Sequence, residues 1–325
     1  MMDSEGFKHI IVTGTGRLTN SIVTNLLKGE SHIQFISGNL PGDEKGIADQ
    51  IADWQLYCNT RLNTERLQYL TSLERNDKAD LVIAVTEEDL SIKQDLINRL
   101  EEAVLPETII ALNTESFSLR ELQSKSRYPN RIIGLNWTEP AYTTLFLEII
   151  ASEATPENII QRIKTVARKE WEKDPYVIQN GSGIRSRLMA AMAREAFFLI
   201  ENGYANVQDI DRACRNDAGY YLPFAGNCRY MDLMGTYAYG LVMKDLNREL
   251  STSDVPPSFF SSMVESGKAG MDAQAGFYDY QDNEKDKWEQ VFRKFSFEIK
   301  EIIDKYPFHY LNKDQEITHS KTKFE

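Results

Sequence analysis

The fold is decided by the stretch KHIIVTGTGRLTNSIVTNLL, residues 8–27. Its first part, residues 8–13, is a short run rich in β-branched side chains and predicts a buried strand. Gly14 and Gly16 follow at once and predict a tight turn. After the turn, apolar residues recur at helical spacing, at Leu18, Ile22, Val23, Leu26 and Leu27. The stretch therefore predicts a strand, a glycine turn and a helix.

The same alternation continues along the first half of the chain. Further strands are expected at 33–36, 80–85, 108–112 and 131–135, where short apolar runs occur. Helices are expected at 92–104, at 119–124 and in the polar stretch 43–78, where Ile47, Ile51 and Trp54 share one face. Strands that alternate with helices predict an α/β fold with a parallel, doubly wound sheet and right-handed crossovers.

The pattern changes after residue 177, where nearly every segment has helical period. Gly181-Ser182-Gly183 predicts a hinge before this helical part. The last helix is expected at 285–305, with Trp288, Phe292, Phe295, Ile299 and Ile302 on one stripe. We therefore expect an α/β domain at 1–180, a helical domain at 181–311 and a polar tail at 312–325.

Composition excludes several classes of function. The net charge of −12, with no stripe rich in lysine or arginine, disfavours nucleic acid as a partner. The cysteines, Cys58, Cys214 and Cys228, form no Cys-x-x-Cys pair, so we expect free thiols and no metal site. The first apolar run, residues 10–12, is too short for a signal peptide or a membrane span. A cytoplasmic protein with no membrane partner is expected.

The order of these segments resembles the 3-hydroxyacyl-CoA dehydrogenase family, from the first strand to Tyr280. The resemblance is carried by several short matches in the same order as in the family. They are Gly14-Thr15-Gly16, Asp80-Leu81-Val82-Ile83, Glu88-Asp89-Leu90, Asn113-Thr114, Gly134-Leu135-Asn136-Trp137, Leu147-Glu148-Ile149-Ile150, Met231-Asp232-Leu233 and Gly276-Phe277-Tyr278-Asp279-Tyr280. The resemblance implies a Rossmann-type doubly wound sheet followed by an all-helical C-terminal dimerisation domain.

The resemblance also implies a nicotinamide cofactor, NAD or NADP, on the glycine turn. Gly14 and Gly16 match the family's fingerprint, but Thr19 stands at the third glycine position, where a side chain would displace the helix or crowd the phosphates. Ser37 replaces the acidic residue that would contact the adenosine ribose. Glu88 and Lys93 match positions near the nicotinamide; the alternative is that both are solvated surface residues.

The family's catalytic residues are only partly present. The resemblance implies a histidine that accepts the hydroxyl proton and a glutamate that orients it. Glu148 matches the glutamate, but Asn136 stands at the histidine position and cannot act as a general base. Glu115 replaces a serine, Glu139 replaces an asparagine, and Ser186 replaces the asparagine that holds substrate. Glu115, Glu139 and Glu148 could form an altered acid–base centre, or Glu115 and Glu139 could face water in an unused cleft.

Two functions remain open from the sequence. The first is an NAD(P)-dependent oxidoreductase for a hydroxyacyl or hydroxy-acid substrate, weakened or altered by the loss of the histidine. The second is a catalytically inactive relative, a pseudoenzyme, that binds a nucleotide, an acyl ligand such as acyl-CoA, or a partner protein. A homodimer through the C-terminal domain is expected. An aromatic cluster of that domain belongs to its core or to the dimer interface in the favoured interpretation, and lines an apolar substrate pocket in the alternative. The cluster comprises Tyr220, Tyr221, Phe224, Tyr230, Tyr237 and Tyr239.

Overall fold

The structure is a computed structural model that describes residues 6–179 and 181–307. By its internal contacts the chain forms two compact units, Met1–Leu188 and Met189–Glu325. The division falls inside a long helix, α6 (Ile184–Glu201), and so lies beyond the predicted hinge at 181–183. Each unit is described by itself below.

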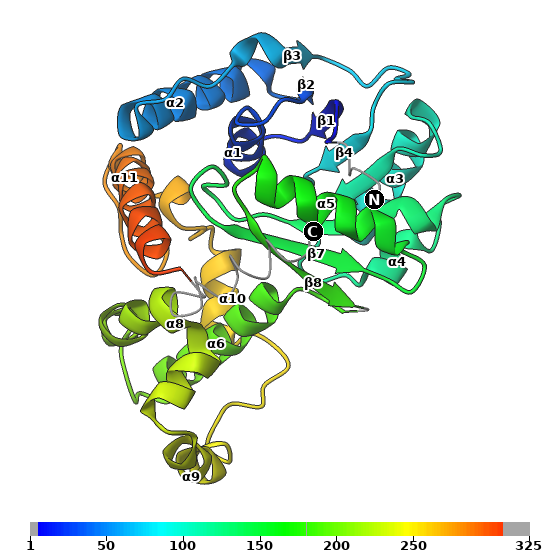
Figure 1. The fold of residues 1–325 in the computed structure, drawn as a ribbon. Coiled ribbons are helices and arrows are strands. Elements are labelled where there is room, and N and C mark those ends of the chain that lie inside the picture. Colours follow the sequence, from blue (N-terminus) through cyan, green and yellow to red (C-terminus); the bar gives the residue numbers. More distant parts are fainter. Residues whose placement is uncertain (1–5, 180, 308–325) are drawn as a thin grey trace. The chain divides into compact units, whose positions relative to one another are not determined.

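The first unit is built on one sheet, which has eight strands in the described part of the chain. The strands are β1 (His9–Thr13), β2 (His32–Ile36), β3 (Leu67–Leu70), β4 (Leu81–Ala84), β5 (Ile109–Leu112), β6 (Ile132–Asn136), β7 (Phe146–Ala151) and β8 (Asp174–Gln179). Their order across the sheet is β3-β2-β1-β4-β5-β6-β7-β8 (Figure 1). Every neighbouring pair is parallel except β6 and β7, which run antiparallel.

Helices connect these strands and cover the sheet. They are α1 (Arg17–Leu26), α2 (Leu40–Cys58), α3 (Leu90–Ala103), α4 (Leu119–Gln123) and α5 (Glu157–Lys169). Single 3₁₀ turns precede β3 and β6, at Thr64–Arg66 and Pro129–Arg131. The predicted Rossmann-type doubly wound sheet is therefore confirmed, with β7 and β8 running opposite to the other six strands.

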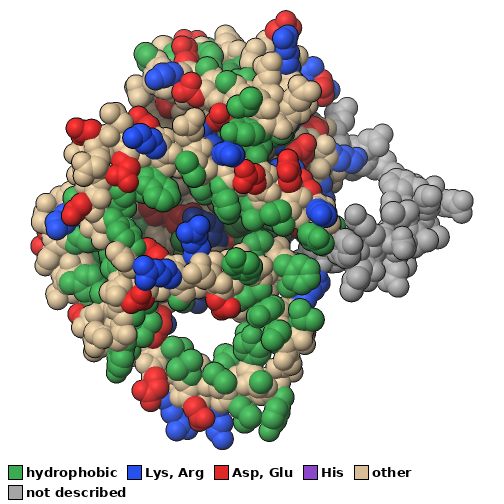
Figure 2. All heavy atoms as spheres, turned by 90° about the vertical axis from the view of Figure 1, so that its left-hand side faces the viewer, with side chains coloured by type: hydrophobic (Ala, Val, Ile, Leu, Met, Phe, Trp, Pro, Cys, Tyr) green, Lys and Arg blue, Asp and Glu red, His purple; other side chains and the backbone are tan. Residues whose placement is uncertain are grey.

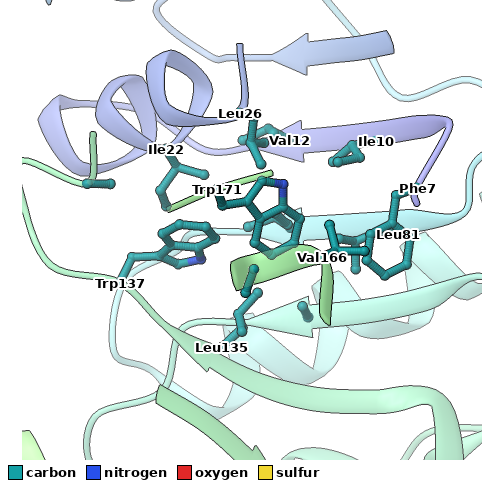
Figure 3. Packing of buried hydrophobic residues seen from close by; sticks show 14 of the residues in the cluster. Phe7, Ile10, Val12, Ile22, Leu26, Leu81, Leu135, Trp137, Val166 and Trp171 are labelled. Carbon is teal, nitrogen blue, oxygen red and sulfur yellow. The ribbon is translucent and has the colours of Figure 1, made fainter. Parts of the chain in front are cut away.

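The central strands are buried because two hydrophobic clusters cover them. All residues of β4, β5 and β6 are buried, as expected for parallel strands with helices on both faces. In one cluster the fully buried Trp171 lies between Phe7 and Trp137, with ring centroids 6.1 and 5.5 Å away (Figure 3). Burying a side chain of this size stabilises the fold by about 3 kcal/mol.

The prediction of helix over 43–78 is correct only in its first part. Helix α2 ends at Cys58, and Asn59 follows in the left-handed region with φ 51°. The chain then forms β3 at the edge of the sheet, paired with β2. The polar side chains of this segment hid the strand, because only one side of an edge strand has a neighbour.

The second unit consists of helices, as predicted. After α6 come α7 (Val207–Ala213), a π-helical turn (Cys214–Ala218), α8 (Gly219–Met234), α9 (Thr236–Leu246), α10 (Ser258–Glu265), a 3₁₀ turn (Met271–Ala273) and α11 (Glu284–Lys305). Helix α8 is broken at Gly226, whose φ is 67°, three residues after Pro223. Gly203 follows the end of α6 with φ 69°, the left-handed conformation that glycine commonly adopts just after a helix. The predicted tail, 312–325, lies outside the described residues.

Many large apolar side chains of the second unit are exposed. Tyr220 and Tyr237 are each 80% exposed, and Trp288, Phe292 and Phe295 of α11 are about half exposed. Hydrophobic side chains gather on the surface in the lower part of Figure 2, at the height of α9 in Figure 1. Within the ranges that the structure describes, each helix is too short or too polar to cross a bilayer. Cys58, Cys214 and Cys228 are free thiols, as predicted.

Candidate functional site

The glycine turn joins β1 to the N-terminus of α1. Gly14 and Gly16 have φ values of 144° and 85°, which favour glycine. A Cβ on Gly14 would lie 2.5 Å from the carbonyl oxygen of Val85, whereas a Cβ on Gly16 would meet no atom of the described residues within 4 Å. Space is therefore open over Gly16, beside the positive end of the α1 dipole. This arrangement suits the pyrophosphate of a dinucleotide.

Thr19 fits beneath this turn. Its side chain is fully buried, and its hydroxyl donates a hydrogen bond to the carbonyl of Thr15 at 3.1 Å. A Cβ on Gly14 would lie 2.9 Å from the Thr19 hydroxyl oxygen, so the absent side chain of Gly14 makes room for Thr19. The Thr19 side chain thus points into the protein and leaves the space over Gly16 open, contrary to the expected crowding of the phosphates.

Ser37 directly follows the end of β2, where the resemblance implies an acidic residue, and it is buried. Its hydroxyl donates to the Asp43 carboxylate and accepts the backbone N–H of Asn39 at 2.9 Å. The other oxygen of Asp43 accepts the backbone N–H of Gly16 at 2.9 Å. The Asp43 carboxylate therefore lies between the glycine turn and the end of β2, and it was not predicted from the sequence.

Asn136 and Glu148 face each other across the antiparallel pair β6 and β7. The Asn136 amide nitrogen donates to Glu148 Oε2 at 2.9 Å and to the Thr114 carbonyl at 2.8 Å. The Asn136 oxygen accepts the Thr114 backbone N–H at 2.8 Å. Both donors and the acceptor of this buried amide are engaged, so Asn136 links three elements and offers no proton acceptor.

Glu148 is fully buried and holds the start of α6. Its Oε1 accepts the backbone N–H groups of Ile184 at 2.8 Å and Arg185 at 3.4 Å, and the Tyr176 hydroxyl at 3.0 Å. The first N–H groups of a helix lack partners within the helix, and the helix dipole favours a carboxylate there. Burial, and then the charge and hydrogen bond of Glu148, raise the pKa of Tyr176 above its ordinary value. Tyr176 is therefore a protonated donor at neutral pH.

Glu115 lies next to this pair through Arg185 and Ser186. The Arg185 guanidinium forms an ion pair with Glu115 at 3.1 Å, and the Ser186 hydroxyl donates to the other Glu115 oxygen. Glu115 and Arg185 are each about a third exposed, at 37% and 35%, so this group faces water. The structure thus brings together Glu115, Asn136, Glu148 and Ser186 of the predicted catalytic set, and adds Tyr176 and Arg185.

Glu88 and Lys93 form a partly buried ion pair at 3.1 Å. Lys93 is fully buried and donates to the Asn113 carbonyl at 2.8 Å, while Glu88 accepts the backbone N–H groups of Glu115 and Ser116. Burial lowers the pKa of Lys93, and the charge of Glu88 opposes this. Burial would raise the pKa of Glu88, but these hydrogen bonds and Lys93 outweigh it and lower the pKa. The pair therefore fixes the loop that carries Glu115. The solvated alternative is wrong for Lys93, whereas Glu88 lies at the surface.

Glu139 belongs to another part of the site. Its carboxylate pairs with Arg17, the first residue of α1, at 3.3 Å. Glu115 and Glu148 are joined through Arg185, whereas Glu139 lies at the glycine turn. The three carboxylates therefore do not form one acid–base centre, and Glu115 and Glu139 are ion-paired rather than free in water.

Neither described histidine lies at this edge of the sheet. His9 and His32 are the first residues of β1 and β2 and stack on each other at 5.4 Å, whereas the site lies at the opposite ends of the parallel strands. His309 and His319 lie outside the described residues. Tyr176 was missed because β8 was not predicted; β7 pairs with β8 so that Glu148 faces Tyr176.

The site can thus hold a dinucleotide along the turn after β1 and position a substrate between the ends of β5 and β6. Ligands of doubly wound folds bind where the strand order reverses, here between β1 and β4. Glu115 is a partly exposed carboxylate at this place and can exchange a proton with a substrate, and Glu88, which contacts the same loop, is another.

Comparison with known proteins gives two family matches that together cover most of the chain. Residues 9–181 match the model described as 3-hydroxyacyl-CoA dehydrogenase, NAD binding domain. Residues 184–280 match the model described as 3-hydroxyacyl-CoA dehydrogenase, C-terminal domain. Helix α11 lies beyond both matches.

Individual relatives agree with these matches. The 5-formyl-3-hydroxy-2-methylpyridine 4-carboxylate 5-dehydrogenase of Mesorhizobium japonicum is 28% identical over 62% of this chain and 66% of its own. The probable 3-hydroxybutyryl-CoA dehydrogenase of Bacillus subtilis is 24% identical over 85% of this chain and 98% of its own. The match to the fatty acid oxidation complex subunit alpha of Vibrio vulnificus spans only 34% of that protein.

Solved structures show the same fold. A crystal structure of a 5-formyl-3-hydroxy-2-methylpyridine 4-carboxylic acid 5-dehydrogenase, named as an NAD⁺-dependent dismutase, superposes with a TM-score of 0.84. It covers 91% of this chain and 98% of its own at 21% identity. The fold agrees with the two consecutive family matches. The chain therefore belongs to the 3-hydroxyacyl-CoA dehydrogenase family.

Proposed function

We propose that the protein is an NAD(P)-dependent oxidoreductase that acts on a hydroxyacyl or hydroxy-acid substrate, with chemistry weakened or altered by Asn136. The observation that carries this proposal is the group formed by Glu115, Arg185 and Ser186 beside the Asn136–Glu148 pair. This group stands where the resemblance implies substrate contacts, and it faces water. The family membership and the open space over Gly16 support a nicotinamide cofactor at the turn.

The cofactor would be held by the backbone of the turn and by the N-terminus of α1. Gly14 and Gly16 allow close approach, and Thr19 supports the turn from below. Arg17 and Glu139 flank the same helix start. When bound, the nicotinamide supplies the hydride acceptor of the family's reaction. Glu88 and Lys93 act on the other side by fixing the loop after β5.

The proton step falls to Glu115 in this proposal. Oxidation of a hydroxyl to a ketone releases one proton from oxygen and one hydride from carbon, and the proton needs an acceptor. Asn136 cannot accept it, and Glu148 is fully buried within the protein. Glu115 is partly exposed, and Ser186 and Arg185 hold it in place. A carboxylate is a weaker base than imidazole, so slow turnover is expected.

A second function, a catalytically inactive relative that binds a ligand or a partner protein, is favoured by one observation. Asn136 stands at the position of the missing histidine, and its side chain is fully engaged in hydrogen bonds to Thr114 and Glu148. This position therefore has a structural role. Such a protein would keep the nucleotide or acyl ligand, acyl-CoA included, without turnover.

The experiment has two steps. Isothermal titration with NADH and with NADPH first measures cofactor binding, and micromolar affinity for either supports the proposal. Hydroxyacyl-CoA and hydroxy-acid substrates are then screened for NADH formation with wild type and Glu115→Gln. Turnover that Glu115→Gln reduces by roughly a hundredfold supports the oxidoreductase. Binding without turnover favours the inactive relative, and no binding at millimolar cofactor contradicts the dehydrogenase.

We also propose that the protein is a homodimer and that the apolar surface of the second unit forms the interface. Tyr220, Phe224 and Tyr237 are more than half exposed in the single chain. Exposed apolar surface of this extent is costly in water and marks interaction sites.

A further inference from the structure

Asp43 is a buried carboxylate whose hydrogen bonds place it at the nucleotide end of the proposed cofactor site. It is 2% exposed and lies in the first turn of α2. Its Oδ1 accepts the Gly16 backbone N–H, and its Oδ2 accepts the Ser37 hydroxyl. No ion pair of Asp43 occurs within residues 6–179 and 181–307. Between the glycine turn and β2, the carboxylate is therefore held by hydrogen bonds and the N-terminus of α2 rather than by a cation.

This location is defined by two chain segments that meet there. Gly16 belongs to the turn after β1, and Ser37 follows Ile36, the last residue of the adjacent strand β2. In doubly wound dinucleotide-binding folds, the adenosine ribose lies at the end of the second strand, beside the turn. The sequence offers only a serine directly after that strand. The fold supplies a carboxylate to the same place from the following helix.

Space is open over two glycines of the segments that surround the carboxylate. Among the described residues, a Cβ on Gly16 would meet no atom within 4 Å, and a Cβ on Gly38 would meet only Thr15 Cγ2 at 3.8 Å. Each carboxylate oxygen can accept about two hydrogen bonds, and each Asp43 oxygen receives one from the groups named here. Ser37 in turn accepts the Asn39 backbone N–H, which holds the hydroxyl toward Asp43.

We propose that Asp43, rather than Ser37, recognises the adenosine ribose hydroxyls and makes the site selective for NAD over NADP. This inference rests on the proposed function. The carboxylate accepts hydrogen bonds from the ribose hydroxyls of NAD. The 2′-phosphate of NADP has no hydroxyl to donate at that position and brings further negative charge toward a buried anion, which is unfavourable. Arg17, the basic residue at the turn, pairs with Glu139.

The test compares NADH and NADPH by isothermal titration for wild type, Asp43→Asn and the matched control Asp49→Asn. Asp49 is an exposed aspartate on the same helix. Wild type and Asp49→Asn should bind NADH about tenfold or more tightly than NADPH, and Asp43→Asn should lose most of this preference. The asparagine oxygen can still accept the Gly16 N–H, so the turn should stay in place. If both affinities fall equally, Asp43 only holds the turn, and the proposal is contradicted.

A second measurement uses the wild-type protein and does not depend on how Asp43→Asn folds. ADP and 2′-deoxy-ADP differ only in the ribose hydroxyl, and wild type should bind ADP severalfold more tightly. Equal affinities would overturn the proposal. A wild type that binds NADH without preferring it to NADPH overturns the role of Asp43 alone. A wild type that binds neither cofactor overturns the proposed function as well.

Discussion

Asn136 shows how one substitution changes the role of a buried pair. Its amide satisfies Glu148 and both backbone groups of Thr114, so the position became a link between β6, β7 and the loop after β5. If the missing base limits turnover, Asn136→His should raise the rate by roughly a hundredfold. The rate should rise with pH through the imidazole pKa, about 6.5 or higher beside Glu148, because only neutral imidazole accepts a proton.

The measurement is the pH profile of turnover with the substrate found by the screen. Asn136→Gln is the control, because it enlarges the side chain without adding a titratable group. Equal rates for the two variants across the pH range would mean that proton transfer at this position does not limit the reaction.

Gly183 is required by the same cluster. A Cβ there would overlap the Glu148 carboxylate and lie 3.3 Å from Asn136 Nδ2. Gly183→Ala should therefore lower the free energy of unfolding by about 1–3 kcal/mol, measured by urea denaturation. Gly181→Ala is the control, since a Cβ there meets nothing nearer than 3.6 Å. A neutral Gly183→Ala would show that the start of α6 adjusts freely.

At the scale of elements, Tyr176 ties β8 to β7 and to the start of α6 through Glu148. Tyr176→Phe removes a hydrogen bond to a buried carboxylate and should cost about 1–3 kcal/mol of stability at pH 7. The folded-state pKa of Tyr176 is raised above the ordinary value of 10.0. The stability from this tyrosine is therefore complete below pH 10 and is lost as the pH rises toward the folded-state pKa.

Urea denaturation between pH 7 and pH 11 measures this difference. The stability gap between wild type and Tyr176→Phe should narrow above pH 10. Tyr220→Phe, at a tyrosine that is 80% exposed, should show no such change. A gap that is constant over this range would contradict the coupling of Tyr176 to Glu148.

Most strands with a clear hydrophobic pattern were predictable from the sequence, and the two outermost strands were not. The strands β1, β2, β4, β5 and β6 lie where short apolar runs predicted them, because both of their faces are covered. The outermost strands β3 and β8 were missed, and so was β7, although nearly all of its residues are buried. Asp43 and Tyr176 were missed because their roles depend on which strands end beside them.

At the scale of the whole molecule, the proposed dimer gives a direct prediction. Light scattering after size-exclusion chromatography should give twice the mass of one chain. Tyr220→Asp combined with Tyr237→Asp should shift it toward the monomer, because each places a charge in an apolar interface. Leu56→Asp, at an exposed apolar residue of α2 in the first unit, is the control. A wild-type monomer at micromolar concentration would contradict the dimer.

The sequence alone determined the fold class, the glycine turn and the loss of the histidine, because periodicity and single residues carry this information locally. The tertiary structure decided which charged groups meet. It joined Glu115 to Arg185, separated Glu139, buried Lys93 and brought Asp43 to the glycine turn. These contacts join residues far apart in the chain or on different elements. They depend on which strands and helices the fold brings together, and no single stretch of sequence specifies that.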